Sequence, residues 1–380
     1  MEMKQIYELV NGITGEITGK TDLVKEDLSN IADVGTSIFD STSVDNYVKS
    51  LVDHIGKVVF VNRSYKGNAP SVLMDGWEFG SVLEKISTDL PKATENESWE
   101  LTDGASYDVN VFYKPKAETK FFNKRVTFEI PMSFTEKQVK SSFSSAEQMN
   151  GFISMIQNSI EKSITVKMDS LVMRTINNMS AQTIHNANSV RAVKLLTEFN
   201  TKFGTELTAE KAITDPTFIR YASYVMGLYV DRLSKMSTLF NIGGKERFTA
   251  REDLHVILLS DFKQSASAYL ESDTFHNELV KLPNAEVVPY WQGSGISYAF
   301  EDTSKITVST QNPTADGTVD VTQGGIIGVM FDRDALGVAN LDRRVTTNYN
   351  AKAEFYNNYY KFDCGYFNDT NENFVVFMIA

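Results

Sequence analysis

The stretch KRVTFEIPMSFTEKQVKSSFSSAEQMNGFISMIQNSI, residues 124–160, changes its hydrophobic period within a few positions. In FFNKRVTFEIPMSF (121–134), apolar side chains occupy alternate positions, which predicts a strand with one buried face. These side chains are Phe122, Val126, Phe128, Ile130, Met132 and Phe134. Pro131 has no N–H group for a sheet ladder, so it predicts a strand end or a sheet edge.

The residues that follow predict one long amphipathic helix within 135–187. Apolar side chains recur at steps of three and four from Met149 to Met179, with most charges between them. A helix of 30 to 40 residues would be roughly 45–60 Å long, longer than a small domain is wide. A coiled coil is the alternative, but the heptad register drifts and no second segment offers an equally long partner helix.

The C-terminal part of the chain predicts a very long, bent strand. From Val345 to Tyr359 the apolar residues keep one parity, and from Tyr360 they take the other. A one-residue phase change of this kind is typical of a β-bulge inside a strand far longer than usual. FVVFMIA (374–380) then predicts a buried strand.

The middle of the chain predicts alternating helices and strands. TDPTFIRY predicts a helix with Thr214 or Asp215 as N-cap and Pro216 at its first position, running to Gly243-Gly244. LHVILLSD (254–261) predicts a buried strand that leads into a helix capped by Asp261. Two further short strands are predicted, KVVFVN (57–62) and AEVVPYW (285–291).

Composition excludes several classes of protein. The net charge is −12, so we expect no broad basic surface for binding nucleic acid. The single cysteine, Cys364, cannot form an internal disulfide, which fits assembly in a reducing cytoplasm. We find no signal-peptide pattern and no apolar run of membrane-spanning length, and therefore expect a soluble, unsecreted protein with no membrane partner.

The heptapeptide GEITGKT (15–21) resembles a phosphate-binding P-loop, with Asp261 as a candidate magnesium ligand. The P-loop pattern needs four residues between its glycines, whereas three separate Gly15 from Gly19. The acidic segment that follows is also unfavourable for phosphate. A P-loop-like nucleotide hydrolase is therefore the least favoured hypothesis, and a turn is the preferred interpretation.

No other pattern predicts a catalytic, cofactor-binding or metal-binding residue. His54, His185, His255, His276 and Cys364 are too scattered for a metal-ligand motif. Neither a nucleophile elbow nor a dinucleotide-binding glycine motif is present. We therefore expect a protein that is not an enzyme and that has no cofactor.

The order of the predicted elements resembles that of the major capsid proteins of tailed double-stranded DNA bacteriophages, which have the Hong Kong 97-like fold. Two stretches carry the resemblance: residues 124–160, quoted above, and GGIIGVMFDRDALGVANLDRRVTTNYNAKAEFYNNYYKFDCGYFNDTNENFVVFMIA (324–380). The first is similar to the family's E-loop strand entering its spine helix. The second is similar to its C-terminal module.

The resemblance implies an α+β fold with four parts. Residues 1–55 would be the N-terminal arm and 56–134 would contain the E-loop β-hairpin. Residues 135–200, with the long spine helix, and 330–370 would form the peripheral domain. Residues 201–329 and 371–380 would form the axial domain. We expect Gly12, Gly15 and Gly19 to let the N-terminal arm bend over a neighbouring subunit.

The resemblance also implies a function and partners. The chain would self-assemble into pentamers and hexamers of an icosahedral shell that encloses phage DNA without sequence-specific contacts. Portal, scaffolding and cement proteins would be further partners. The chain would assemble in the host cytoplasm and would be located in the capsid of the finished virion. An encapsulin-like nanocompartment shell is the alternative.

Some relatives join a lysine to an asparagine of another subunit. Lys114, Lys116 and Lys120 lie in the predicted loop, and Asn357 and Asn358 lie in the predicted long strand. Because both residue types are abundant in this chain, we assign no crosslink.

Overall fold

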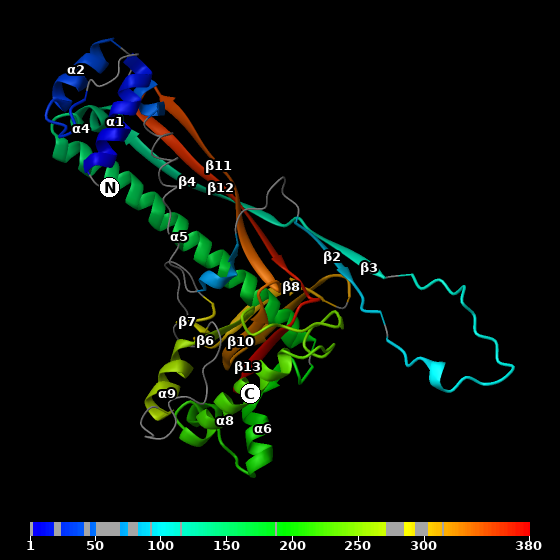
Figure 1. The fold of residues 1–380 in the computed structure, drawn as a ribbon. Coiled ribbons are helices and arrows are strands. Elements are labelled where there is room, and N and C mark those ends of the chain that lie inside the picture. Colours follow the sequence, from blue (N-terminus) through cyan, green and yellow to red (C-terminus); the bar gives the residue numbers. More distant parts are fainter. Residues whose placement is uncertain are drawn as a thin grey trace.

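The computed structural model describes residues 3–18, 24–41, 46–50, 69–74, 83–91, 93–114, 116–186, 188–270, 285–292, 303–313 and 315–380. One long helix, α5, runs along the molecule, and a narrow hairpin projects from its side (Figure 1). The helices are α1 (Met3–Thr18), α2 (Ile31–Ser41), α4 (Glu136–Ser142), α5 (Ala146–His185), α6 (Leu195–Phe203), α7 (Ala209–Ala212), α8 (Pro216–Leu233) and α9 (Ser260–Leu270). The predicted strand 57–62 lies outside the described residues.

The described strands form two larger sheets and two hairpins. They are β1 (Leu73–Met74), β2 (Leu83–Thr88), β3 (Ala117–Phe122), β4 (Arg125–Thr135), β5 (Ala192–Lys194), β6 (Leu254–Leu259), β7 (Ala285–Val288), β8 (Ile306–Gln311), β9 (Thr318–Gln323), β10 (Ile326–Asp332), β11 (Leu336–Asn350), β12 (Phe355–Asn368) and β13 (Phe374–Met378). One sheet has the order β1-β11-β12-β4 and the other the order β5-β13-β10-β6-β7. The β2–β3 and β8–β9 pairs stand apart from both sheets.

The strand predicted at 121–134 is divided between two sheets. Its alternation is confirmed in β4, where Ile130 and Phe134 are buried and their neighbours are exposed. The prediction of one continuous strand is wrong, because the chain leaves the β2–β3 hairpin at Phe122 and joins β12 from Arg125. Pro131 lies in the edge strand, as one of the two predicted alternatives requires, and does not end the ladder.

The long helix is confirmed as the 40 residues of α5, which is about 60 Å long at 1.5 Å per residue. Ser145 begins it, its side chain accepting a hydrogen bond from the Gln148 backbone N–H. Its apolar face packs on the four-stranded sheet, for example where the Phe134 and Phe152 rings lie 5.6 Å apart. This packing on a sheet explains the helix without a coiled-coil partner.

A β-hairpin replaces the single bent strand predicted near the C-terminus. β11 and β12 pair antiparallel, with Tyr349 opposite Tyr356, and residues 351–354 form the turn between them. The Asn350 side chain accepts hydrogen bonds from the Lys352 and Ala353 backbone N–H groups, and Glu354 adopts a φ of 50°. The inward-facing residues change from odd to even positions because the chain reverses at this turn, not because of a bulge. The bulge lies instead between Asn340 and Arg343 in β11.

The five-stranded sheet is buried on both faces, which explains its uninterrupted apolar runs. In β13, Phe374, Val376 and Met378 belong to the core that contains α5. Val375 and Phe377 of the same strand belong to a second core with α6 and α8. The predicted buried strand at the end of the chain is thus confirmed.

Helix α8 begins as predicted and ends earlier than predicted. Asp215 is its N-cap, accepting hydrogen bonds from the Thr217 and Phe218 backbone N–H groups at 2.9 Å, and Pro216 occupies the first position. The helix ends at Leu233, about three turns before Gly243. The residues in between form irregular loops in which Phe240 and Asn241 are buried.

The buried hydroxyl of Tyr360 gives a first test of this core. The side chain is fully buried, burial raises its pKa, and the hydroxyl has no hydrogen-bond partner among the described residues. Because an unsatisfied buried hydroxyl costs free energy, Tyr360→Phe is expected to raise the free energy of unfolding by about 1 kcal/mol. Denaturant unfolding measures the change.

Tyr366→Phe is the matched control, because the Tyr366 hydroxyl does have a partner. It accepts a hydrogen bond from Arg174 Nη2 at 2.8 Å, so its removal is expected to leave stability unchanged or lower it slightly. A loss of stability in Tyr360→Phe would contradict a buried hydroxyl without a hydrogen-bond partner.

Candidate assembly surfaces

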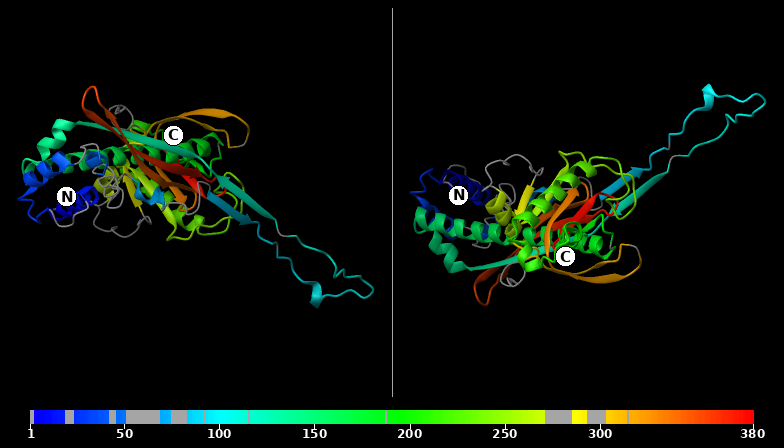
Figure 2. Two further views of the ribbon diagram at one scale, coloured as in Figure 1. Left: turned by 90° about the horizontal axis from the view of Figure 1, so that it is seen from above. Right: turned by 90° about the horizontal axis from the view of Figure 1, so that it is seen from below.

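The β2–β3 hairpin and the loop at its end project far from the rest of the molecule. We call residues 83–122 the hairpin arm. Figure 2 shows in two views that it extends beyond both sheets and all the described helices. β2 and β3 pair antiparallel from Leu83 opposite Phe122 to Thr88 opposite Ala117. Beyond them the described loop residues are irregular, apart from one short 3-10 helix at Glu97–Trp99.

Large apolar side chains are exposed along this loop. Trp99, Val109, Phe112 and Tyr113 are 94%, 89%, 84% and 83% exposed. Leu101 and Val111 add to the same surface. Such a concentration of exposed apolar groups is typical of a surface that another protein covers.

The loop carries negative charge together with its apolar groups. Residues 93–113 contain five acidic residues and no lysine or arginine. The loop is shaped by short-range hydrogen bonds, such as those from the Ser98 N–H to Asn96 Oδ1 and from the Asn110 N–H to Asp108 Oδ1. Its partner surface should therefore offer apolar area and positive charge.

The N-terminal helices pack on the core of this same chain. Val10, Ile13, Ile31 and Val34 are buried in the core that includes α5, which α1 contacts directly. The expectation that Gly12 and Gly15 are hinges is wrong, because both lie inside α1. Gly19 lies outside the described residues.

The same helix argues against a P-loop. Gly15, Glu16, Ile17 and Thr18 belong to α1, whereas a P-loop wraps phosphate with a loop that precedes a helix. Lys20 and Thr21 are not described. The prediction of Asp261 as the N-cap of α9 is wrong, because the helix already begins at Ser260 and Asp261 lies in its first turn. The Asp261 carboxylate instead accepts a hydrogen bond from Thr303 Oγ1 at 2.5 Å.

The structure gives the remaining candidate residues local partners. His255 is half-buried against the Phe331 ring, and burial lowers its pKa. His185 lies in the last turn of α5, while His54 and His276 lie outside the described residues. Cys364 is buried, with its Sγ 3.3 Å from Met168 Sδ. Among the described residues, no group of three or more His, Cys, Asp or Glu is placed to hold a metal ion.

The lysines and asparagines considered for a crosslink lie in different environments. Lys114 is exposed in the loop, whereas Lys120 pairs with Asp369 at 3.2 Å. Asn357 accepts a hydrogen bond from Ser133, and the buried Asn358 donates to the Met132 carbonyl at 3.2 Å. Both asparagine side chains are thus engaged between strands of their own sheet.

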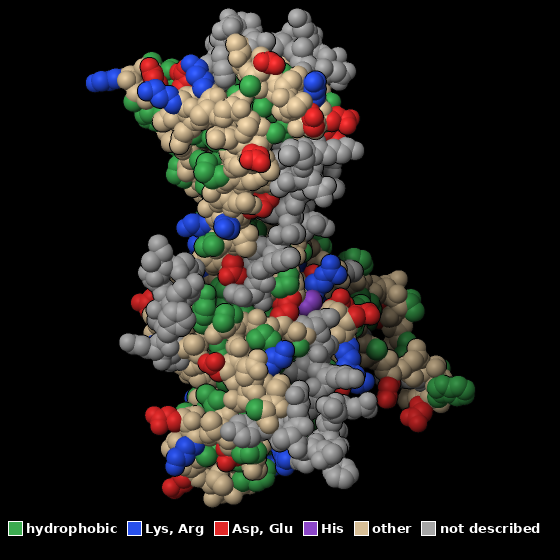
Figure 3. Space-filling view, turned by 90° about the vertical axis from the view of Figure 1, so that its left-hand side faces the viewer, with side chains coloured by type: hydrophobic (Ala, Val, Ile, Leu, Met, Phe, Trp, Pro, Cys, Tyr) green, Lys and Arg blue, Asp and Glu red, His purple; other side chains and the backbone are tan. Residues whose placement is uncertain are grey.

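Acidic and basic side chains are intermingled on the described part of the face drawn in Figure 3. No helix of the described chain is long and apolar enough to cross a membrane. The exposed apolar side chains of the hairpin arm therefore make it the candidate surface for contact with another protein.

Known proteins resemble this chain in sequence or in fold. The family model of the Phi29-like phage major capsid protein matches residues 7–378. The major capsid protein of Bacillus phage B103 is 27% identical over 165 residues, which are 42% of this chain and 35% of that protein. The major capsid protein of Bacillus phage GA-1 is 26% identical over 165 residues, which are 42% of this chain and 34% of that protein. The chain thus spans about a third of the length of these relatives.

A solved capsid shares the arrangement of helices and sheets. The capsid structure of Staphylococcus phage Andhra has a TM-score of 0.53 and 10% identity, covering 83% of this chain and 85% of that chain. At this identity the likeness establishes the Hong Kong 97-like fold and nothing finer. Because the family model spans nearly the whole sequence, the chain belongs to the Phi29-like phage major capsid protein family.

Proposed function

We propose that this chain is the coat subunit of a tailed phage, assembling with copies of itself into the pentamers and hexamers of an icosahedral shell around double-stranded DNA. The observation that carries the proposal is the hairpin arm, whose exposed aromatic side chains need a neighbour to cover them. Family membership supports the same role. On this proposal the chain acts as a structural protein, has no catalytic site and resides in the virion.

The parts of the fold suggest how such a subunit is divided. We propose that the hairpin arm is the E-loop, that α5 with the four-stranded sheet is the peripheral domain, and that the five-stranded sheet with α8 and α9 is the axial domain. Since β5 pairs with β13, this division favours a boundary before Ala192, earlier than residue 200. We also propose that residues 1–55 are the N-terminal arm, of which α1 and α2 lie beside the N-terminal end of α5 (Figure 1).

The net charge of −12 supports a container whose wall does not bind its DNA tightly. We propose portal, scaffolding and cement proteins as further partners, by analogy with phage shells. An encapsulin-like compartment would use the same fold but would lack a portal and a scaffold.

Expression of the chain alone and together with a candidate scaffolding protein tests the proposal. We expect closed particles in electron micrographs and a fast-sedimenting species in the ultracentrifuge. Particles that form without any scaffold and enclose a cargo enzyme would favour the compartment. A uniformly monomeric chain under all assembly conditions would contradict both.

A further inference from the structure

The root of the hairpin arm rests on the body through charged groups. In β2 and β3 the side chains that face the body are half-buried, and they include Lys85, Lys120 and Glu118. Lys85 and Lys120 stand directly opposite each other in the ladder. Two like charges at such positions destabilise a hairpin unless a counter-charge lies between them.

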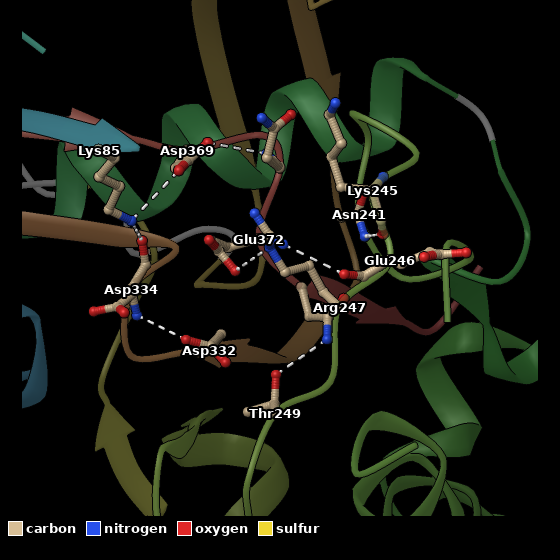
Figure 4. A network of polar contacts seen from close by, with 12 residues as sticks. Lys85, Asn241, Lys245, Glu246, Arg247, Thr249, Asp332, Asp334, Asp369 and Glu372 are labelled. Carbon is tan, nitrogen blue, oxygen red and sulfur yellow. Dashed lines mark hydrogen bonds and ion pairs between the residues drawn. The ribbon is translucent and has the colours of Figure 1, made fainter. Parts of the chain in front are cut away.

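Asp369 supplies that counter-charge. Its carboxylate oxygens lie 3.4 Å from Lys85 Nζ, a contact drawn in Figure 4, and 3.2 Å from Lys120 Nζ. One side chain therefore holds both strands. Asp369 is 3% exposed, and its backbone N–H donates to the Ala335 carbonyl at 2.7 Å. The anion is therefore fixed by the body, and the arm brings the two cations to it.

A second contact, farther along the arm, has the opposite charges. Lys245 Nζ lies 2.8 Å from Glu118 on β3 and 3.2 Å from Asp89, just beyond β2. The loop of Lys245 is held by the buried Asn241, whose side chain accepts from the Lys245 N–H at 2.8 Å and donates to its carbonyl at 2.7 Å. The Gly243 N–H donates to the Thr370 carbonyl at 2.8 Å, which joins this loop to the loop of Asp369.

Together these contacts make a charge pattern that specifies one orientation of the arm on the body. The arm presents the cations Lys85 and Lys120 to the anion Asp369 of the body. Farther along, it presents the anions Glu118 and Asp89 to the cation Lys245. A shifted or inverted orientation of the arm would bring like charges together. The described apolar support at the root is small, chiefly the Phe122 and Phe367 rings 5.2 Å apart.

Water can reach this junction. A cleft of about 190 Å³ lies beside it and is lined by Lys85, Lys120, Arg247, Asp369 and Glu372 among others. The carboxylates of Asp89 and Glu118 are 47% and 42% exposed, and solvated ion pairs of this kind contribute little each and weaken as salt screens them. Asp369 is buried, but its partners Lys85 and Lys120 are still partly exposed to solvent. A junction of this kind can open without unfolding either of the two parts that it joins.

We propose that these two contacts form an ionic latch, consisting of Asp369 with Lys85 and Lys120 and of Lys245 with Glu118 and Asp89. The latch holds the hairpin arm at one angle to the body and releases it as a rigid unit at the non-strand residues Asn123 and Lys124. An arm that can swing in this way fits neighbours presented at different angles. That use rests on the proposed shell function, whereas the latch itself does not.

Spin-label distance measurements on the unassembled full-length chain test the latch. Labels at Ala117→Cys on the arm and Glu210→Cys on α7 report the angle, because both positions are exposed and the native Cys364 is buried. We expect one narrow distance population at low salt. In about 1 M NaCl, where the screening length is ~3 Å, a second population should appear.

Charge variants make the test specific. Lys245→Glu is expected to produce the second population at low salt, and adding Glu118→Lys and Asp89→Lys should restore the single one. Lys361→Ala is the control, since it removes an exposed ion pair with Glu129 at 3.1 Å elsewhere on the chain.

A distance distribution unchanged by salt and by Lys245→Glu would overturn the latch. If Lys245→Glu fails to fold, the salt series on the unmodified residues still decides. Because no particle is needed, a failure of the latch would leave the shell proposal intact, and a failure to assemble would leave the latch intact.

Discussion

Replacing Trp99, Phe112 and Tyr113 together by serine is expected to abolish particle formation while the isolated chain stays folded. These three side chains are among the most exposed large apolar groups of the described chain. Because they contribute nothing to the core, their loss should leave the unfolding transition unchanged. Each should contribute about 2 kcal/mol per subunit when a neighbour buries it, and a shell repeats that contact in every copy.

Sedimentation velocity measures particle formation, and circular dichroism measures whether the isolated chain stays folded. The conservative triple variant Trp99→Phe, Phe112→Tyr and Tyr113→Phe keeps the apolar area and should assemble. If the serine variant forms particles as well as the unmodified chain does, the hairpin arm is not an assembly surface.

Gly325→Ala is expected to destabilise the fold by about 3 kcal/mol or more. Gly325 has a φ of 75°, and a Cβ atom built there would overlap the Ile379 carbonyl oxygen. The backbone at this point is bonded to the C-terminal segment, because the Ile379 N–H donates to the Gly325 carbonyl at 2.7 Å. The variant therefore combines the strain of a left-handed residue, about 1–2 kcal/mol, with an overlap on a backbone atom that no side-chain movement can relieve.

Gly244→Ala separates these two causes. Gly244 has a similar φ of 63°, but a Cβ there would meet nothing within 4 Å. We expect it to cost only the conformational strain. Equal losses in the two variants, measured by denaturant unfolding, would show that the close approach to Ile379 does not matter.

Hydrophobic periodicity predicted the parts of this fold in which one face or both faces are buried. The α5 stripe and the apolar run of β13 were both identified from the sequence, because burial against a sheet or between two layers dictates side-chain type directly. The recognised resemblance supplied the fold, which the family match and the solved capsid support.

Breaks between elements were harder to predict. The alternation from Phe122 to Phe134 continues across the point where the chain moves from one sheet to another, because both sheets bury the same parity. The turn at 351–354 contains neither glycine nor proline. Asn350, which accepts hydrogen bonds from two backbone N–H groups of the turn, was the only local signal in that sequence.

The assembly surface was only partly predictable. The exposed residues Tyr107, Val109, Val111 and Tyr113 alternate along the loop as the buried face of a strand would, so periodicity could not mark them as exposed. The ionic latch depends on residues from β2, β3 and two distant loops, so only the folded chain brings Asp369 and Lys245 to the root of the hairpin arm. Charged residues scattered along a sequence give no sign of such a meeting.

Electron cryomicroscopy of assembled particles tests the shell function most directly. We predict an icosahedral shell in which the loop residues Trp99, Phe112 and Tyr113 of each subunit are buried against a neighbouring copy, beside basic side chains. A reconstruction that leaves these three side chains in solvent, or a chain that forms no closed particle with its scaffold present, would contradict the proposed role.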